Sequence, residues 1–209
     1  MLTEPLSIAV HAVVRTGVEL GDTVVIQGTG PIGIMTIAVA RECGASRIIV
    51  TGAPKNRLKL AEEFGADVVI DINDVPDVEE RIKLVKRETP NGYGADVVIE
   101  FTGVPDAIPE GLEFMRDCGR YCVGGQFTDH GPTQINPYKM MLAKQNRIVS
   151  VFGAEPRHFV KALNILRSGK YPFDKLVSHK LPLERCEEAM KTIVTHTYSL
   201  DGKEAIKMT

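Results

Sequence analysis

Apolar and polar positions follow two patterns along the chain: short β-branched runs, and longer stretches with helical spacing. The short runs lie about twenty to thirty residues apart, at 23–28, 47–52, 67–72, 96–101, 120–125 and 147–152. They are nearly continuous in valine and isoleucine, which is typical of strands covered by helices on both faces. Strands that alternate with helices indicate βαβ units. The sequence therefore predicts an α/β protein with a doubly wound, six-stranded parallel sheet.

The stretches between these runs predict the connecting helices. Residues 56–64 place Leu58, Ala61 and Phe64 on one face and stop at Gly65, a residue type that commonly ends helices. Further helices are expected over 5–16, 78–87 and 158–166 and after Pro105-Asp106. Ser178-His179-Lys180-Leu181-Pro182-Leu183 is expected to lead into another helix that runs through Met190.

The part of the chain after the sixth run is too short for a second domain. Its amphipathic segments, together with a terminal run at 204–207, need an apolar surface to cover. That surface lies either on the sheet domain or on something outside this chain, and the sequence leaves both alternatives open.

Composition and charge narrow the class of protein. The chain has 209 residues with 25 basic and 27 acidic side chains, and its formal net charge is −2. Because these charges form no basic stripe, neither a nucleic acid nor a membrane is favoured as a partner. No apolar run approaches the ~20 residues that span a bilayer, and the first five residues lack the features of a signal peptide. A cytoplasmic protein is expected, with free thiols at Cys43, Cys118, Cys122 and Cys186, which contain no CxxC pair.

The most informative motif is the run Gly28-Thr29-Gly30-Pro31-Ile32-Gly33, between a β-branched strand and a helical pattern. In such a turn the first glycine makes the bend, the second lets the backbone approach a pyrophosphate, and the third lets the helix pack on the strand. Pro31 suits the first helical position, where a missing N–H costs nothing. The motif predicts a nicotinamide dinucleotide site that includes Gly28, Gly30, Pro31, Ile32 and Gly33.

The end of the second strand bears on which nicotinamide cofactor is bound. An NAD site usually has Asp or Glu there to bind the ribose hydroxyls, but this chain has Thr51-Gly52, followed by Lys55 and Arg57. A missing carboxylate and two cations favour the 2′-phosphate of NADP. The alternative, that Lys55 and Arg57 are solvated residues at a helix start, stays open.

Several motifs in order resemble the medium-chain, zinc-dependent alcohol and polyol dehydrogenases. They are Glu4-Pro5-Leu6-Ser7-Ile8-Ala9-Val10-His11-Ala12, Gly21-Asp22-Thr23-Val24-Val25, the glycine motif, Gly65-Ala66-Asp67, residues 95–103, and Ser178-His179-Lys180-Leu181-Pro182-Leu183. The resemblance covers essentially the whole chain. It implies a Rossmann dinucleotide-binding domain over residues 1–153, with a lead-in helix, and a short C-terminal remnant of the catalytic domain over 154–209.

The resemblance also implies that a part is missing. Family members carry an N-terminal catalytic segment with a cysteine and a histidine as zinc ligands and a proton relay, and this segment is absent here. Glu4 matches a family position at the metal site, but one carboxylate cannot hold a catalytic zinc, which takes three protein ligands. Glu4 is thus either a remnant of the metal site or an exposed residue at a helix start.

Other positions carry over by motif. Thr102-Gly103, at the carboxyl end of the fourth strand, would approach the cofactor, and Val123-Gly124-Gly125 and Val151-Phe152 match segments that face the nicotinamide in the family. The alternative for Val123, Val151 and Phe152 is a role in the core. The five histidines show no pair at metal-ligand spacing, and each is expected to be structural or exposed.

The leading hypothesis is a zinc-dependent oxidoreductase, or a fragment of one, that moves hydride between a secondary alcohol or polyol and NAD(P). This chain would supply the cofactor half and would be inactive alone, with the catalytic segment acting in trans. The alternatives are a non-catalytic NAD(P)-binding or regulatory module and, less favoured, a methyltransferase. The sixth strand would be an exposed sheet edge, which predicts a homo-oligomer.

Overall fold

The computed structural model describes residues 1–177 and 180–195, so His179, His196 and the run at 204–207 lie outside the described residues. Six parallel strands form one sheet in the order β3-β2-β1-β4-β5-β6. They are β1 (Thr23–Gln27), β2 (Arg47–Gly52), β3 (Val68–Asp71), β4 (Ala95–Glu100), β5 (Met115–Val123) and β6 (Arg147–Ser150). The predicted doubly wound parallel sheet is confirmed. The strand order reverses between β1 and β4, the switch point at which such sheets bind ligands.

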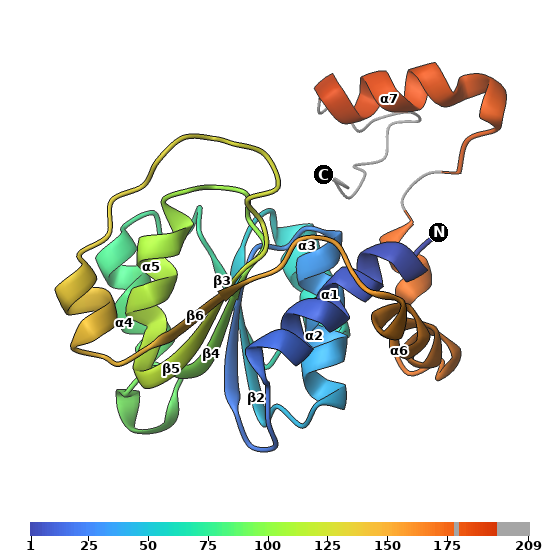
Figure 1. The fold of residues 1–209 in the computed structure, drawn as a ribbon. Helices are drawn as coiled ribbons and strands as arrows, with labels where there is room; N and C mark the ends of the chain where they lie inside the picture. Colours follow the sequence, from blue (N-terminus) through green and yellow to red (C-terminus); the bar gives the residue numbers. More distant parts are fainter. Residues whose placement is uncertain (178–179, 196–209) are drawn as a thin grey trace.

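Helices cover both faces of the sheet (Figure 1). The helices of the described residues are α1 (Thr3–Thr16), α2 (Pro31–Glu42), α3 (Lys55–Glu63), α4 (Val78–Arg87), α5 (Ala107–Phe114), α6 (Pro156–Arg167) and α7 (Cys186–Thr195), with short helical turns at Pro90–Gly92, Tyr138–Leu142, Phe173–Leu176 and Leu183–Arg185. Figure 1 shows α7 apart from the sheet. The predicted helices therefore form: the one over 78–87 has the predicted ends, those over 5–16, 56–64 and 158–166 have ends shifted by at most two residues, and α7 ends five residues after Met190.

Alternate residues of the strands supply the two cores. Val24 and Ile26 of β1 belong to the cluster formed with α1, α2, α3 and α6, whereas Val25 packs with α4 and α5. Every residue of β1 is buried. This explains the continuous apolar runs, because a strand buried on both faces has no solvent-facing positions to fill with polar side chains.

Strand β5 starts at Met115, five residues before the predicted run, and it follows α5 without a loop. The sequence pattern does not predict the first half of this strand, because Arg116, Asp117 and Gly119 interrupt the apolar run. The pairing with β4 is also irregular here, and Cys118 has a positive φ of 56°. A local bulge of this kind separates the two regularly paired ends of the strand.

The segment after α6 covers the sheet domain itself. Phe173 and Leu176 join the core cluster of α1 and α2, and the Phe173 ring meets the Phe64 ring edge-on with centroids 5.4 Å apart. The Lys170 ammonium lies 3.0 Å from the Glu42 carboxylate. The alternative left open by the sequence is therefore settled for this segment: it packs on the sheet domain.

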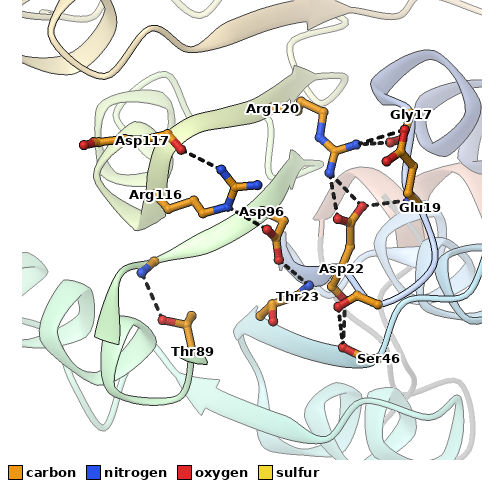
Figure 2. A network of polar contacts seen from close by, with 12 residues as sticks. Gly17, Glu19, Asp22, Thr23, Ser46, Thr89, Asp96, Arg116, Asp117 and Arg120 are labelled. Atoms are coloured by element: carbon orange, nitrogen blue, oxygen red, sulfur yellow. Dashed lines mark hydrogen bonds and ion pairs between the residues drawn. The ribbon is translucent and has the colours of Figure 1, made fainter. Parts of the chain in front are cut away.

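A polar network ties the amino ends of the strands together (Figure 2). The Arg120 guanidinium donates to both carboxylate oxygens of Asp22, at 2.7 and 2.8 Å, and to the carbonyl of Gly17. Asp96 accepts from the Thr23 amide at 2.7 Å and from Arg116 at 2.6 Å. These contacts fix β1, β4 and β5 at the end of the sheet opposite to their carboxyl ends, where ligands bind in such folds.

Candidate functional site

A cleft of about 530 Å³ opens at the carboxyl ends of the strands. Its walls come from the turns after β1, β2, β4 and β5, on both sides of the switch point. The predicted cofactor residues on its walls are Gly28, Gly30, Ile32, Gly33, Gly52, Arg57, Thr102, Gly124 and Gly125.

The turn between β1 and α2 depends on glycine at two positions. Gly28 has a φ of +104°, and a Cβ there would lie 2.6 Å from the Phe101 carbonyl oxygen. A Cβ on Gly33 would lie 2.2 Å from the carbonyl oxygen of Gly28. Gly30 caps α2 and Pro31 is its first residue, as predicted. The first amides of a helix have no intrahelical acceptor, so this end of α2 offers donors and positive potential to an anion.

The turn after β2 forms the second wall. A Cβ on Gly52 would lie 2.7 Å from Thr29 Cγ2, and the Thr29 hydroxyl donates to the Ala53 carbonyl at 2.7 Å. The buried Thr51 lies in β2, behind the wall, where its carbonyl accepts from the Gly28 amide at 2.8 Å. These contacts hold the first and second turns against each other.

The two predicted cations separate in space. Arg57 is 5 % exposed and lines the cleft beside Gly52. The Lys55 side chain is 74 % exposed and lies outside the cleft lining, with its ammonium 3.0 Å from Asp74. Lys55 therefore lies outside the cleft lining, with Asp74 on the loop after β3 as its partner, and its contact with a cofactor stays a prediction.

A buried carboxylate holds the turns after β4 and β5. Glu100, with no exposed surface, accepts at Oε1 from the Thr102 amide at 2.6 Å, the Thr102 hydroxyl at 2.7 Å and the Gly103 amide at 3.1 Å. Its Oε2 accepts from the Gly125 amide at 3.1 Å. Sequence reasoning missed Glu100 as a site residue. The available signal was an acidic residue that ends the apolar run Val97-Val98-Ile99.

Several predicted residues lie behind or beside the cleft lining. Pro31 starts α2, Val123 ends β5, and Val151 is buried in the core cluster with its amide 3.0 Å from the Val123 carbonyl. Phe152 is 87 % exposed. Gly103, expected beside Thr102 at the end of β4, also lines the cleft. Lining residues that the prediction did not include are Thr29, Ala53, Pro54, Ile72, Phe101, Val104 and Phe127. Most are apolar residues next to the predicted turns, and only the tertiary structure shows which of them face the cleft.

The described residues do not fit a zinc site. Within residues 1–177 and 180–195, no group of three His, Cys, Asp or Glu side chains is placed to hold a metal ion. Glu4 is exposed in the first turn of α1. His158 is 1 % exposed, stacks on His11 with ring centroids 4.5 Å apart, and accepts from the Glu155 amide at 3.0 Å. Burial lowers the pKa of His158, which fits the structural role expected of it.

No helix among the described residues has the length and apolarity needed to cross a membrane.

The parallel sheet with strand order 3-2-1-4-5-6 and the glycine turn at its switch point define a Rossmann-type α/β protein. The sequence profile of the zinc-binding dehydrogenases matches residues 31–168. The chain belongs to this family. The family assignment decides against the methyltransferase alternative.

Individual relatives agree with this assignment. The chain is 35 % identical over 207 residues to an erythritol/L-threitol dehydrogenase of Mycolicibacterium smegmatis, covering 98 % of this chain and 53 % of the relative. An alcohol dehydrogenase structure from Thermotoga maritima shares 34 % identity with a TM-score of 0.88, over 93 % of this chain and 53 % of the other. A zinc-binding dehydrogenase from Sinorhizobium meliloti 1021, solved with NADP, shares 28 % identity with a TM-score of 0.72, over 83 % and 49 %. The chain thus spans about half the length of the curated relatives it matches.

Proposed function

We propose that this chain binds NAD(P) in the cleft and forms the cofactor half of an oxidoreductase acting on a secondary alcohol or polyol. The observation that carries the proposal is the cradle at Gly28, Gly33 and Gly52, where added Cβ atoms would lie 2.2 to 2.7 Å from neighbouring atoms. Backbone of this kind can approach a pyrophosphate closely, and the N-terminus of α2 supplies the donors. The dehydrogenase relatives support the same activity.

The strand order supports opposite sides of the cleft for the two halves of the dinucleotide. In a doubly wound sheet, the adenosine half lies over the end of β2 and the pyrophosphate over the first turn. We therefore expect the adenosine beside Gly52 and Arg57, and the nicotinamide half towards Thr102 and Gly125. The bound nicotinamide would supply the hydride donor or acceptor at its C4. The residues of this chain bind and orient it.

The preference for NADP rests on Arg57. A guanidinium at this wall offers charge-assisted hydrogen bonds to a 2′-phosphate, and β2 ends without the carboxylate that would repel it. The NADP found in the Sinorhizobium relative supports this choice. Calorimetric titration of NADP and NAD tests it: NADP is expected to bind more tightly, and Arg57→Met is expected to remove the difference. Lys55→Met is the matched control, and equal effects of the two variants would contradict the assignment.

We further propose that the chain alone does not turn over alcohols, and that zinc and the proton relay belong to a catalytic segment supplied in trans or elsewhere in the complete enzyme. The support is the half-length match and the missing three-ligand group among the described residues. Glu4 then remains a candidate neighbour of that metal. The same observations favour the second candidate, a non-catalytic NAD(P)-binding module. Adding the N-terminal segment of a relative separates the two: restored alcohol oxidation indicates a split enzyme, and continued inactivity a module.

The proposal has three further parts: a domain division at 153/154, a cytoplasmic location, and a homo-oligomer that forms through the sheet edge. Within the described residues β6 pairs with β5 only, and Ile148 in β6 is 37 % exposed. Tyr138 and Leu142, on the helical turn that precedes β6, are each 70 % exposed. An open edge with apolar neighbours pairs readily with a second copy. Light scattering that shows only a monomer at high concentration would count against the oligomer.

A further inference from the structure

The turns after β4 and β5 meet at the buried side chain of Glu100. A Cβ on Gly125 would lie 2.5 Å from Glu100 Oε1 and 2.7 Å from the amide nitrogens of Thr102 and Gly103. Gly103 has a φ of +74° and would place a Cβ 3.3 Å from the Gly125 carbonyl oxygen. The two turns therefore approach as closely as backbone allows, with one carboxylate between them.

Glu100 bridges the two turns through different oxygens. Oε1 serves Thr102 and Gly103, which follow β4, and Oε2 serves the Gly125 amide, which follows β5. Within residues 1–177 and 180–195 Glu100 makes no ion pair. Its four donors are three backbone amides and a hydroxyl, all from these two turns, so each hydrogen bond of the carboxylate helps to fix the shape of the turns. Burying a carboxylate is unfavourable unless hydrogen bonds compensate for its lost hydration, and these four donors provide them.

Both turns belong to the cleft wall, whereas the Glu100 carboxylate lies behind it. Thr102, Gly103 and Gly125 line the cleft, and Glu100 has no exposed surface. On the opposite side, the wall at Gly52 and Arg57 is held by the separate contacts of Thr29. The two halves of the cleft are therefore fixed by different sets of hydrogen bonds.

From this arrangement we infer that Glu100 is a positioning residue for the nicotinamide half of the cleft, acting through the turns at Thr102–Gly103 and Gly124–Gly125. The inference rests on the proposed function, because it needs a dinucleotide in the cleft. It assigns Glu100 no contact with the cofactor. Its role is to hold the two turns at the spacing that receives the nicotinamide ribose and ring.

Glu100→Gln tests this role with almost no change in volume. The amide carbonyl can occupy the position with three donors at Oε1, which turns the NH₂ group towards the Gly125 amide, where two donors face each other. The link to the β5 turn is then lost, while the contacts to Thr102 and Gly103 remain. Losing that link is expected to raise the Kd of the reduced dinucleotide about tenfold.

The experiment compares ADP with NADPH and NADH, by calorimetry and by the fluorescence of the reduced ring. ADP reports on the adenosine half and pyrophosphate, so its Kd is expected to stay within about twofold of wild type. At saturation, the fluorescence of the bound reduced nicotinamide ring is expected to differ between Glu100→Gln and wild type. A variant that is merely less stable but still folded would not show this difference. Glu110→Gln is the matched control: the Glu110 side chain is 12 % exposed, pairs with Arg81 at 2.7 Å and lies outside the cleft lining. It is expected to leave both affinities unchanged.

The outcomes separate the inference from the proposed function. Selective loss of dinucleotide binding in Glu100→Gln supports the positioning role. Retention of both ligands, or equal loss of both by folded protein, overturns that role and leaves the proposed function standing. Failure of wild-type protein to bind either ligand overturns the proposed function and the inference together. If Glu100→Gln does not fold, Thr102→Val removes the 2.7 Å hydroxyl contact to Glu100, together with the 3.0 Å contact that the hydroxyl accepts from the Val104 amide, and wild-type binding of both ligands by that variant overturns the inference.

Discussion

The substitution Gly33→Ala tests the glycine cradle most directly. Its Cβ would lie 2.2 Å from the carbonyl oxygen of Gly28. Side-chain Cβ atoms essentially never approach another heavy atom closer than 3.0 Å, so helix and turn must separate by about 0.8 Å or more. The turn cannot shift easily, because the Gly28 amide donates a hydrogen bond to the Thr51 carbonyl at 2.8 Å and the Gly28 Cα packs on the Phe101 carbonyl.

Two opposing terms set the effect on stability. Alanine within a helix gains up to about 1 kcal/mol over glycine, and overpacking costs about 1–3 kcal/mol. Because the overlap is with backbone, we expect the cost to prevail, with a net loss of about 1–2 kcal/mol. The effect on binding is larger. Displacing the first amides of α2 from the pyrophosphate forfeits at least one hydrogen bond to a charged group, about 1.5–3 kcal/mol, or roughly a 10- to 150-fold rise in Kd.

The assay is calorimetric titration with NADPH, alongside thermal unfolding. Gly21→Ala is the control: Gly21 has a φ of +92°, lies in the open with nothing within 4 Å, and stands far from the cleft. It should lose about 1 kcal/mol of stability from backbone strain and bind as wild type does. A Gly33→Ala protein with unchanged affinity and a raised unfolding temperature would refute the reasoning.

Three further predictions concern the scaffold. Arg120→Met leaves a buried carboxylate unpaired and should lower the unfolding free energy in urea by about 3–5 kcal/mol; a loss below about 1 kcal/mol would show that the network in Figure 2 is dispensable. The lowered pKa of His158 means that its contribution to stability is complete above pH 6.5 and is lost as the pH falls through the folded pKa. Urea unfolding at pH 7.5 and 5.5 should show a smaller pH dependence in His158→Asn, with the exposed His130→Asn as control. Phe173→Ala should cost about 3–5 kcal/mol, whereas Val160→Ala, 59 % exposed on α6, should cost little in the same measurement; equal effects would mean that the segment after α6 does not contribute to the core.

The sequence determined the elements whose signals are local. Continuous valine and isoleucine runs specify strands buried on both faces, and Gly28, Gly30 and Gly33 specify the turn between β1 and α2, because each requirement acts within a few residues. The same holds for Gly65, which ends α3 with a φ of +103°. Strand β5 was located only in its apolar half, because the pairing of Met115 with Ala95 is a long-range contact with no periodic pattern behind it.

The tertiary structure decided which residues share a wall of the cleft. Lys55 and Arg57 are near neighbours in sequence, but only Arg57 faces the cleft, because Asp74, on the loop after another strand, holds Lys55 outside it. Glu100 ends its strand like an ordinary polar residue in the sequence, and its four donors come from two turns that the packing of β4 against β5 brings together. Local patterns fix backbone conformation, whereas the partner of a buried charge is set by chain segments that meet only after the sheet has formed.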